Sequence, residues 1–283
     1  MVSGYCEHDP GTDRFWLTAE QQACLADDGG PNFVAGGTST VSAVHRRVEQ
    51  VAAAFRDEGE LTWHDHDPGL FSGVARGFRP AFETHLVASW IPALDGVAAR
   101  LRAGGRVANV ACGFGASTVL LAQGYPDATV SGFDQHDLSI AAARRAAAEA
   151  GVAGRVTFEV ADAASLPGGP YDLVTILNAL HEMGDPVGAC RRVQQVLADG
   201  GQLMVVEPPA PGRLEHNHTP VGRSFLTAST MVCLPSAISQ GGDRHLGAQA
   251  PDAEFADIAR GAGFSRCERV IETPLHPVLQ FTP

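Results

Sequence analysis

The glycines and the aspartate between residues 106 and 135 have the types and the spacing that nucleoside binding requires. An apolar run, residues 107–111, leads into the loop Cys112-Gly113-Phe114-Gly115, and a second apolar run, residues 128–133, ends directly before Asp134. Glycines let a backbone approach a ligand at the end of a strand, and a carboxylate about 20 residues further on accepts hydrogen bonds from both ribose hydroxyls. The segment therefore predicts half of a nucleotide-binding βαβ unit.

The same loop has no features that would bind a pyrophosphate. It reads G-x-G, and Ser117 and Thr118 stand where a dinucleotide-binding loop has its third glycine. The chain also contains no lysine, so a Walker-type lysine is absent. A nucleoside without phosphates fits these residues better, and S-adenosylmethionine is the commonest such ligand.

A second candidate for chemistry is the pair His181-Glu182, which follows the apolar run of residues 173–177. Ligands of open α/β folds bind at the carboxyl ends of the strands. A histidine there can take the proton from a phenol, hydroxyl or amine while Glu182, or another acid, holds its tautomer. The alternative is that His181 bonds only to backbone and closes the loop before Asp185.

The other histidine-rich segments are weaker candidates. His64-Asp65-His66-Asp67 contains metal-ligating residue types, but adjacent residues in an irregular segment do not converge on one ion, so a solvated loop is predicted. His216, His218 and Arg223 are expected to be wall residues near the substrate, and Cys112 is expected to be a small buried side chain beside the cofactor.

Composition excludes several classes of function. The net charge is −12, which argues against a nucleic-acid surface. No apolar run approaches 18 residues and the N-terminus lacks the features of a secretory signal, so we expect a cytoplasmic protein without a membrane partner. The six cysteines form no C-x-x-C pair, and neither a metal nor a disulfide framework is predicted.

Strands and helices must alternate from about residue 96 onward to position these side chains. Strands are predicted at 107–111, 128–133, 156–160, 173–177 and 202–206, and helices at 117–124, 137–149 and 185–197, with Asp137 or Ser139 as N-cap of the second helix. A long irregular insert, residues 208–250, precedes a helix at 252–261 and strands at 267–272 and 277–281. This pattern predicts an α/β fold with a Rossmann-like, seven-stranded, mostly parallel sheet.

Residues 1–95 are predicted to form a smaller, mainly helical region, and residues 96–283 the catalytic domain with its insert 208–250. The N-terminal region begins with a hairpin at residues 4–17, followed by helices at 19–25, 41–55 and 71–90 and by a loop at 61–69.

With these motifs placed, the chain resembles class I S-adenosylmethionine-dependent methyltransferases, and among them a bacterial group with an N-terminal winged-helix-like region, here apparently truncated. The resemblance extends over nearly the whole chain and rests on the stretches WIPALDGVAARL, VANVACGFGAST, VSGFDQHDLSI, YDLVTILNALHEMGDPVGA, VVEPPA, NHTPVGR and LGAQA.

The resemblance implies a role for individual residues. Gly113 and Gly115, with the backbone around Ala111, would pass under the methionine moiety of the cofactor. Asp134 would bind the ribose hydroxyls with Gln135 beside it. The resemblance also implies that Asp162 would bind the adenine amino group, that Ala163 would contact the adenine ring and that Asn178 would lie beside the sulfonium.

The chain departs from the pattern of the family at three positions. Asn109 replaces an acid that would contact the cofactor's ammonium group, a loss of about 1–3 kcal/mol if nothing replaces it. Ala111 replaces the first loop glycine, which matters if this residue needs a positive φ. Phe114 stands where relatives often carry a polar residue.

The leading hypothesis is therefore methyl transfer from S-adenosylmethionine to a small-molecule hydroxyl, phenol or amine in natural-product biosynthesis, by a homodimer. A methyltransferase-like enzyme that catalyses cyclisation, isomerisation or decarboxylation is the alternative, motivated by Asn109 and Ala111. A ligand-responsive regulator is a third hypothesis, which the acidic hairpin disfavours because Glu7, Asp9 and Asp13 face a single Arg14 there.

Overall fold

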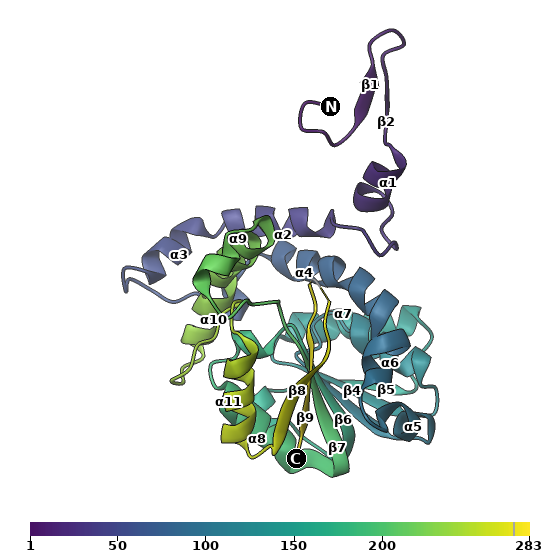
Figure 1. Ribbon diagram of the computed structural model, residues 1–283, viewed down its shortest axis with the longest axis vertical. Helices are drawn as coiled ribbons and strands as arrows, with labels where there is room; N and C mark the ends of the chain where they lie inside the picture. The colour runs from purple at the N-terminus through teal and green to yellow at the C-terminus, as the bar shows by residue number, and fades with distance from the viewer. Residues whose placement is uncertain (274) are drawn as a thin grey trace.

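The computed structural model describes residues 1–273 and 275–283, and a seven-stranded sheet forms its centre (Figure 1). Its strands are β3 (Arg106–Val110), β4 (Thr129–Asp134), β5 (Val156–Val160), β6 (Tyr171–Leu177), β7 (Leu197–Val206), β8 (Arg266–Ile271) and β9 (Val278–Thr282). The strand order is β5-β4-β3-β6-β7-β9-β8; the first five are parallel, and β9 and β8 pair antiparallel. This arrangement confirms the predicted mostly parallel, Rossmann-like sheet.

Helices cover both faces of the sheet because its strands are apolar on both sides. In β3, Val107 faces one hydrophobic cluster and Ala108 the other. The Val107 cluster includes α5 (Val97–Arg102), α6 (Ala116–Gly124) and α7 (Asp137–Glu149), whereas the Ala108 cluster includes α8 (Pro186–Val196) and α11 (Asp252–Ala262). The carboxyl ends of the parallel strands remain uncovered by these two layers.

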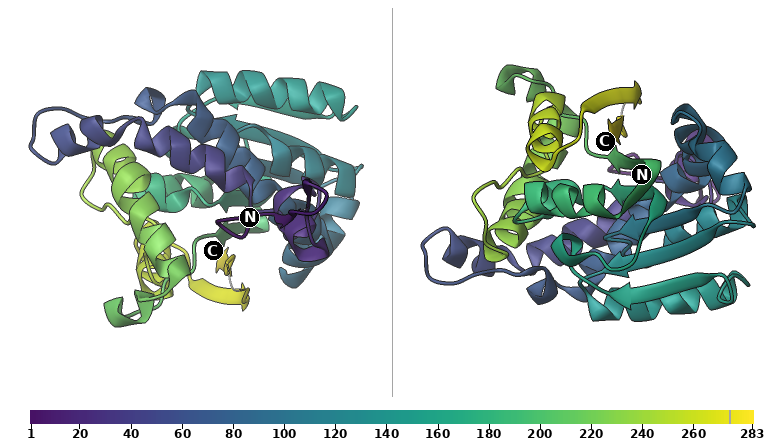
Figure 2. Two further views of the ribbon diagram at one scale, coloured as in Figure 1. Left: turned by 90° about the horizontal axis from the view of Figure 1, so that it is seen from above. Right: turned by 90° about the horizontal axis from the view of Figure 1, so that it is seen from below.

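The N-terminal region lies across that end of the sheet. Strands β1 (Glu7–Asp9) and β2 (Arg14–Trp16) form the predicted hairpin, which projects away from the rest of the molecule above α1 (Ala19–Leu25) (Figure 1). Helices α2 (Gly36–His45) and α3 (Val48–Ala54) follow one another across the molecule (Figures 1 and 2). The single helix predicted over residues 41–55 is wrong, because Arg46 and Arg47 separate two helices.

Helix α4 (Pro68–Ala81) continues directly into a π-helical segment, η2 (Phe82–Trp90), and a short 3-10 turn, η3 (Ile91–Ala93). Phe82, Leu86 and Trp90 are buried in the same hydrophobic cluster as Val107 of the sheet. The helical segment ends at Ala93, and its buried residues pack in one cluster with Val97 and Val107 from beyond residue 95. The predicted division of the chain at residue 95 stays a prediction.

The insert after β7 is mostly helical, so the prediction of an irregular stretch over residues 208–250 is wrong. It contains the 3-10 turn η6 (Leu214–Asn217), α9 (Pro220–Ala228), the π-helical turn η7 (Ser229–Cys233) and α10 (Leu234–Ser239). Thr219 caps α9 by accepting a hydrogen bond from Gly222 N, and prolines occupy the first turns of α9 and α10. A proline in a first helical turn costs no intrahelical hydrogen bond, so these prolines begin helices here.

Two local predictions also differ from the structure. Neither Asp137 nor Ser139 caps α7; His136 is the N-cap residue and provides no side-chain cap, and Ser139 bonds to the His136 ring instead. Residues 61–69 contain the 3-10 turn η1 (Trp63–Asp65), and α4 already begins at Pro68 with Asp67 as its N-cap. Within the described residues, no helix has the length and apolarity that a membrane span requires.

Candidate active site

A cavity of about 300 Å³ opens at the carboxyl ends of β3, β4 and β6, beneath α4. Most of the residues predicted to contact a cofactor or substrate line it: Ala111, Gly113, Asp134, Gln135, Asp162, Ala163, Asn178 and Glu182. Gly115, Asn109 and His181 do not. Cys112, predicted to be buried beside the cofactor, and Phe114 also line the cavity.

The glycine loop turns sharply because three of its residues adopt positive φ angles. These angles are +54° at Ala111, +52° at Gly113 and +82° at Gly115. Gly115 begins α6, and a Cβ atom there would lie 2.8 Å from Ala143 Cβ. Gly115 therefore allows α6 to pack closely on α7, outside the cavity. Ala111 occupies a conformation that costs about 1–2 kcal/mol for a residue with a Cβ atom.

Asp134 lies at the end of β4 with its carboxylate against the glycine loop. The side chain is nearly buried and accepts hydrogen bonds from Gly113 N at 2.8 Å and from His136 N at 2.9 Å. Burial raises the pKa of Asp134, while the two backbone donors lower it. An ionised carboxylate offers about four acceptor positions, so this one retains acceptor capacity for further donors from the cavity.

Asp162 and Ala163 lie at the start of the 3-10 turn η4 (Ala163–Ser165), on the wall next to Asp134. Asp162 accepts a hydrogen bond from Ala164 N at 2.7 Å, so it caps a turn, and it is also exposed to the cavity. This carboxylate therefore caps the turn and can also bind a molecule in the cavity.

Asn109 is buried outside the cavity, and its side chain hydrogen-bonds to other side chains of the protein. Its amide nitrogen donates to Ser117 Oγ at 2.7 Å and to Thr118 Oγ1 at 2.8 Å, and its carbonyl accepts from Thr175 Oγ1 at 3.0 Å. These bonds connect β3 to α6 and β6. The structure therefore does not bring Asn109 to the predicted cofactor contact.

Asn178, directly after β6, has a strained backbone and an unpartnered side chain. Its φ angle is +54°, and both polar atoms of its amide are buried without a hydrogen-bond partner in the described structure. Leaving a buried polar group unpaired costs about 1–3 kcal/mol. Because Asn178 also lines the cavity, its amide is available to a bound molecule.

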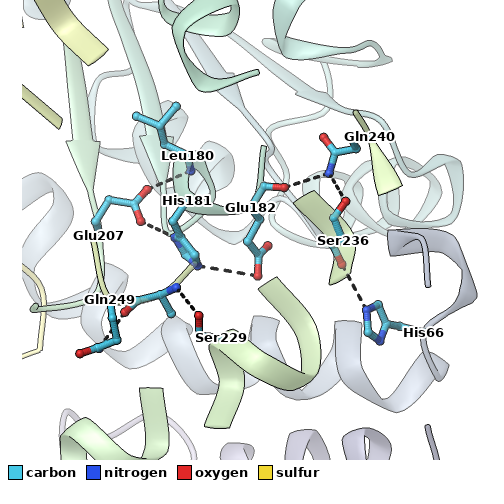
Figure 3. A network of polar contacts seen from close by, with 10 residues as sticks. His66, Leu180, His181, Glu182, Glu207, Ser229, Ser236, Gln240 and Gln249 are labelled. Carbon is cyan, nitrogen blue, oxygen red and sulfur yellow. Dashed lines mark hydrogen bonds and ion pairs between the residues drawn. The ribbon is translucent and has the colours of Figure 1, made fainter. Parts of the chain in front are cut away.

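His181 and Glu182 belong to a buried polar network at the neighbouring strand end (Figure 3). Glu207, directly after β7, accepts hydrogen bonds from His181 Nδ1 and from Leu180 N. Burial alone would lower the pKa of His181, but the Glu207 carboxylate and Cys233 raise it well above its ordinary value. Glu207 is thus the acid that holds the histidine tautomer. Its position at the end of a predicted strand was the sequence signal for it.

Glu182 and Gln240 are the members of this network that line the cavity. The Glu182 carboxylate lies 3.8 Å from His181 Nε2, and the Glu182 carbonyl accepts a hydrogen bond from Gln240 Nε2 at 2.8 Å (Figure 3). Burial raises the pKa of Glu182, whereas the charge of His181 lowers it. His181 itself is 3% exposed and lies behind Glu182. Of the two predicted catalytic residues, Glu182 therefore lines the cavity and His181 does not.

Aromatic side chains from the N-terminal region form the opposite wall of the cavity. They are Trp63, Phe71, Phe78 and Phe82. Trp63 and Phe71 have ring centroids 5.3 Å apart, and Phe71 also lies 4.4 Å from the ring of His136. In the sequence Phe71, Phe78 and Phe82 are apolar positions of a predicted helix and Trp63 lies in a predicted loop, so none of them was predicted as a site residue.

The prediction of a solvated loop at residues 64–67 is wrong for His66. This side chain is buried and its Nε2 lies 3.2 Å from Ser236 Oγ, which connects η1 to α10 (Figure 3). Asp67 pairs with Arg46 through two hydrogen bonds. His216, His218 and Arg223 are exposed and do not line the cavity.

Half of the chain matches a known protein family, and part of it matches curated proteins. A family described as "Methyltransferase domain" matches residues 101–242. The 27-O-demethylrifamycin SV methyltransferase of Amycolatopsis mediterranei is 35% identical over 120 residues, which is 41% of this chain and 44% of that protein. The chain spans about half the length of the curated relatives it matches.

Solved structures match over nearly the whole chain. An O-methyltransferase family protein from Burkholderia thailandensis has a TM-score of 0.71 at 16% identity, with 99% of this chain and 80% of that chain covered. An O-methyltransferase from neocarzinostatin biosynthesis, solved with S-adenosylmethionine and 2-hydroxy-5-methyl naphthoic acid, has a TM-score of 0.61 at 17% identity, with 99% and 81% covered. At these identities the structural likeness establishes a shared fold.

Proposed function

Because this chain belongs to the methyltransferase domain family, we propose that it transfers a methyl group from S-adenosylmethionine to a small-molecule acceptor. One observation carries the proposal: a ribose-type carboxylate, Asp134, and a carboxylate suited to accept a proton, Glu182, line the same cavity. The absence of a phosphate-binding loop from the sequence supports a nucleoside cofactor without phosphates.

In this proposal the residues at the strand ends would hold the cofactor. Asp134 would accept hydrogen bonds from the ribose hydroxyls, and Asp162 and Ala163 would contact the adenine. Gly113 and Ala111 would present backbone to the methionine moiety, and the Asn178 amide would hydrogen-bond to it. When bound, S-adenosylmethionine supplies an electrophilic methyl group on a sulfonium.

The acceptor would occupy the space between the cofactor contacts and the aromatic wall. Its oxygen would take the methyl group that the cofactor supplies, and the Glu182 carboxylate would accept its proton. Burial raises the pKa of Glu182, which makes the carboxylate a stronger base than one in water. His181, fixed by Glu207, acts as a positioning residue behind Glu182. Holding both reactants in line would lower the barrier by up to about 7–11 kcal/mol.

The aromatic wall of Trp63, Phe71, Phe78 and Phe82 favours a planar, apolar acceptor. We propose O-methylation of a phenol or hydroxyl of an aromatic natural product. One matched protein is named for the acceptor 27-O-demethylrifamycin SV, and the matched O-methyltransferase from neocarzinostatin biosynthesis was solved with 2-hydroxy-5-methyl naphthoic acid. A homodimer formed through the N-terminal region completes the proposal, and cytoplasmic location stays a prediction.

The test is a methyl-transfer assay with S-adenosylmethionine and a panel of phenols and hydroxylated polyketides, read by mass spectrometry. We expect a mass gain of one methyl in an aromatic acceptor, with one equivalent of S-adenosylhomocysteine formed. Glu182→Gln should lower this rate by at least about 100-fold, the usual contribution of a general base, without changing cofactor affinity. An acceptor altered without consumption of the cofactor would contradict the proposal.

A further inference from the structure

Three side chains of different types converge beside the cavity and outside the proposed cofactor contacts. His181, Glu182 and Cys233 each offer one ligand atom, and these atoms all lie within 4.8 Å of one another. Nitrogen, oxygen and sulfur ligands of this kind are those that bind Zn²⁺, at about 2.0–2.3 Å from the metal. Modest side-chain rotations toward a common centre would complete such a site.

The histidine is oriented as in a metal site. Glu207 holds His181 through Nδ1, so that Nε2 is the ring atom turned toward Glu182 and Cys233. Glu207 is itself fixed by Leu180 N at 2.9 Å. A carboxylate on the far nitrogen of a metal-binding histidine is a recurrent arrangement, because it fixes the ring and makes Nε2 a better ligand.

Cys233 reaches this position through an irregular helix. It is the last residue of the π-helical turn η7, and Ser229 at the start of that turn accepts a hydrogen bond from Ala248 N at 3.1 Å. π-Helical turns frequently occur at functional sites. The thiol is 3% exposed and free of any disulfide.

We propose that His181 Nε2, the Glu182 carboxylate and Cys233 Sγ bind one Zn²⁺ ion, and that the bound ion inhibits methyl transfer. Glu182 lines the cavity, so the fourth position of the metal faces the cavity and is open to water or a ligand. Coordination replaces the thiol proton of Cys233 and the Nε2 proton of the charged His181, and both protons are released to solvent. The inhibitory part rests on the proposed function, because the metal occupies the carboxylate that accepts the acceptor's proton.

The experiment measures metal binding and activity separately. Protein treated with a chelator is titrated with Zn²⁺ against a chromogenic chelator, and with Co²⁺ while the thiolate-to-metal absorption is recorded. We expect one equivalent of Zn²⁺ bound and a thiolate–Co²⁺ band in the wild type. Both should be lost in Cys233→Ala and retained in Cys267→Ala, a half-buried cysteine on β8. Glu207→Gln should weaken Zn²⁺ binding by about 10–100-fold.

In the methyl-transfer assay, Zn²⁺ should inhibit the wild type, whereas the rate of Cys233→Ala, compared with its own metal-free rate, should not fall when Zn²⁺ is added. Stoichiometric Zn²⁺ binding that persists in Cys233→Ala, or the absence of a thiolate–Co²⁺ band in the wild type, would overturn the metal site. A protein that shows the band and methylates no acceptor would retain the metal site and refute the proposed function. Metal binding with undiminished methyl transfer would overturn the inhibition.

Discussion

At the scale of single residues, two residues that line the cavity have a strained backbone. Of the four described non-glycine residues with positive φ, two line the cavity, Ala111 and Asn178. Such conformations persist where the surrounding structure imposes them, and they concentrate at functional sites. The sequence predicted that both residues lie at the site, but neither strain could be read from it, since φ depends on the path of the folded loop.

Relieving one of these strains should stabilise the protein. Ala111→Gly removes the Cβ atom at φ +54°, and we expect the free energy of unfolding to rise by about 1 kcal/mol. Ala146→Gly, the same change within α7, should lower it by about 1 kcal/mol. Urea unfolding monitored by circular dichroism measures both; a loss of stability in Ala111→Gly would show that the alanine is not strained.

The charge of His181 should appear in the pH dependence of the rate. Glu182 accepts a proton only when ionised, so the rate falls as the pH decreases through the pKa of Glu182. Burial raises that pKa above its ordinary value and the His181 charge lowers it. His181→Gln removes the lowering charge, so the acidic limb of the profile of kcat should move to higher pH. His218→Gln, at an exposed histidine, should leave the profile unchanged.

A limb that stays in place, or moves to lower pH, in His181→Gln would contradict this account of the pair. The sequence predicted His181 and Glu182 as neighbours at the strand end, but not which of them faces the cavity. That orientation depends on Glu207, which comes from a segment distant in sequence.

At the scale of elements, strands and helices of the sheet were predictable because apolar runs and turn residues alternate regularly there. Helix α7 and strand β5 have the bounds that the sequence predicts. The insert was mispredicted because Pro220 and Pro235 resemble chain breakers in a sequence, whereas here they lie in the first turns of helices. Their effect depends on a cap and a packing partner that local composition does not reveal.

The proposed role of the aromatic wall in binding the acceptor can be tested by substitution. Trp63→Ala should raise the KM for the acceptor by about tenfold, the value of one lost aromatic contact, and leave cofactor affinity unchanged. Phe55→Ala, at a 73% exposed aromatic residue of the same region, should have no effect. An equal loss of cofactor and acceptor affinity in Trp63→Ala would contradict a separate acceptor wall.

At the scale of the whole molecule, the hairpin contrasts with the compact sheet and its helices. Tyr5, Phe15 and Trp16 expose large apolar side chains on a segment that projects from the rest of the chain (Figure 1). An isolated two-stranded hairpin is marginally stable in water. The turn residues in the sequence predict this hairpin. They do not show which surface, if any, the hairpin packs against, because that surface comes from residues elsewhere.

We expect these aromatic side chains to support a homodimer. Size-exclusion chromatography with light scattering should give twice the chain mass, and the double variant Phe15→Ser, Trp16→Ser should give a monomer. Val160→Ser, at a 54% exposed valine on the edge strand β5, should remain dimeric. A wild type that is monomeric at micromolar concentration would refute the dimer.

Calorimetric titration measures whether the cavity binds S-adenosylmethionine through Asp134, as proposed. The wild type should bind S-adenosylmethionine and S-adenosylhomocysteine at micromolar concentration. Asp134→Ala should lose at least about 100-fold in affinity, since two hydrogen bonds to a charged group are removed. Asp137→Ala, at an exposed acid three residues away, should bind as the wild type does. Absence of binding in the wild type, or equal binding in Asp134→Ala, would contradict the account.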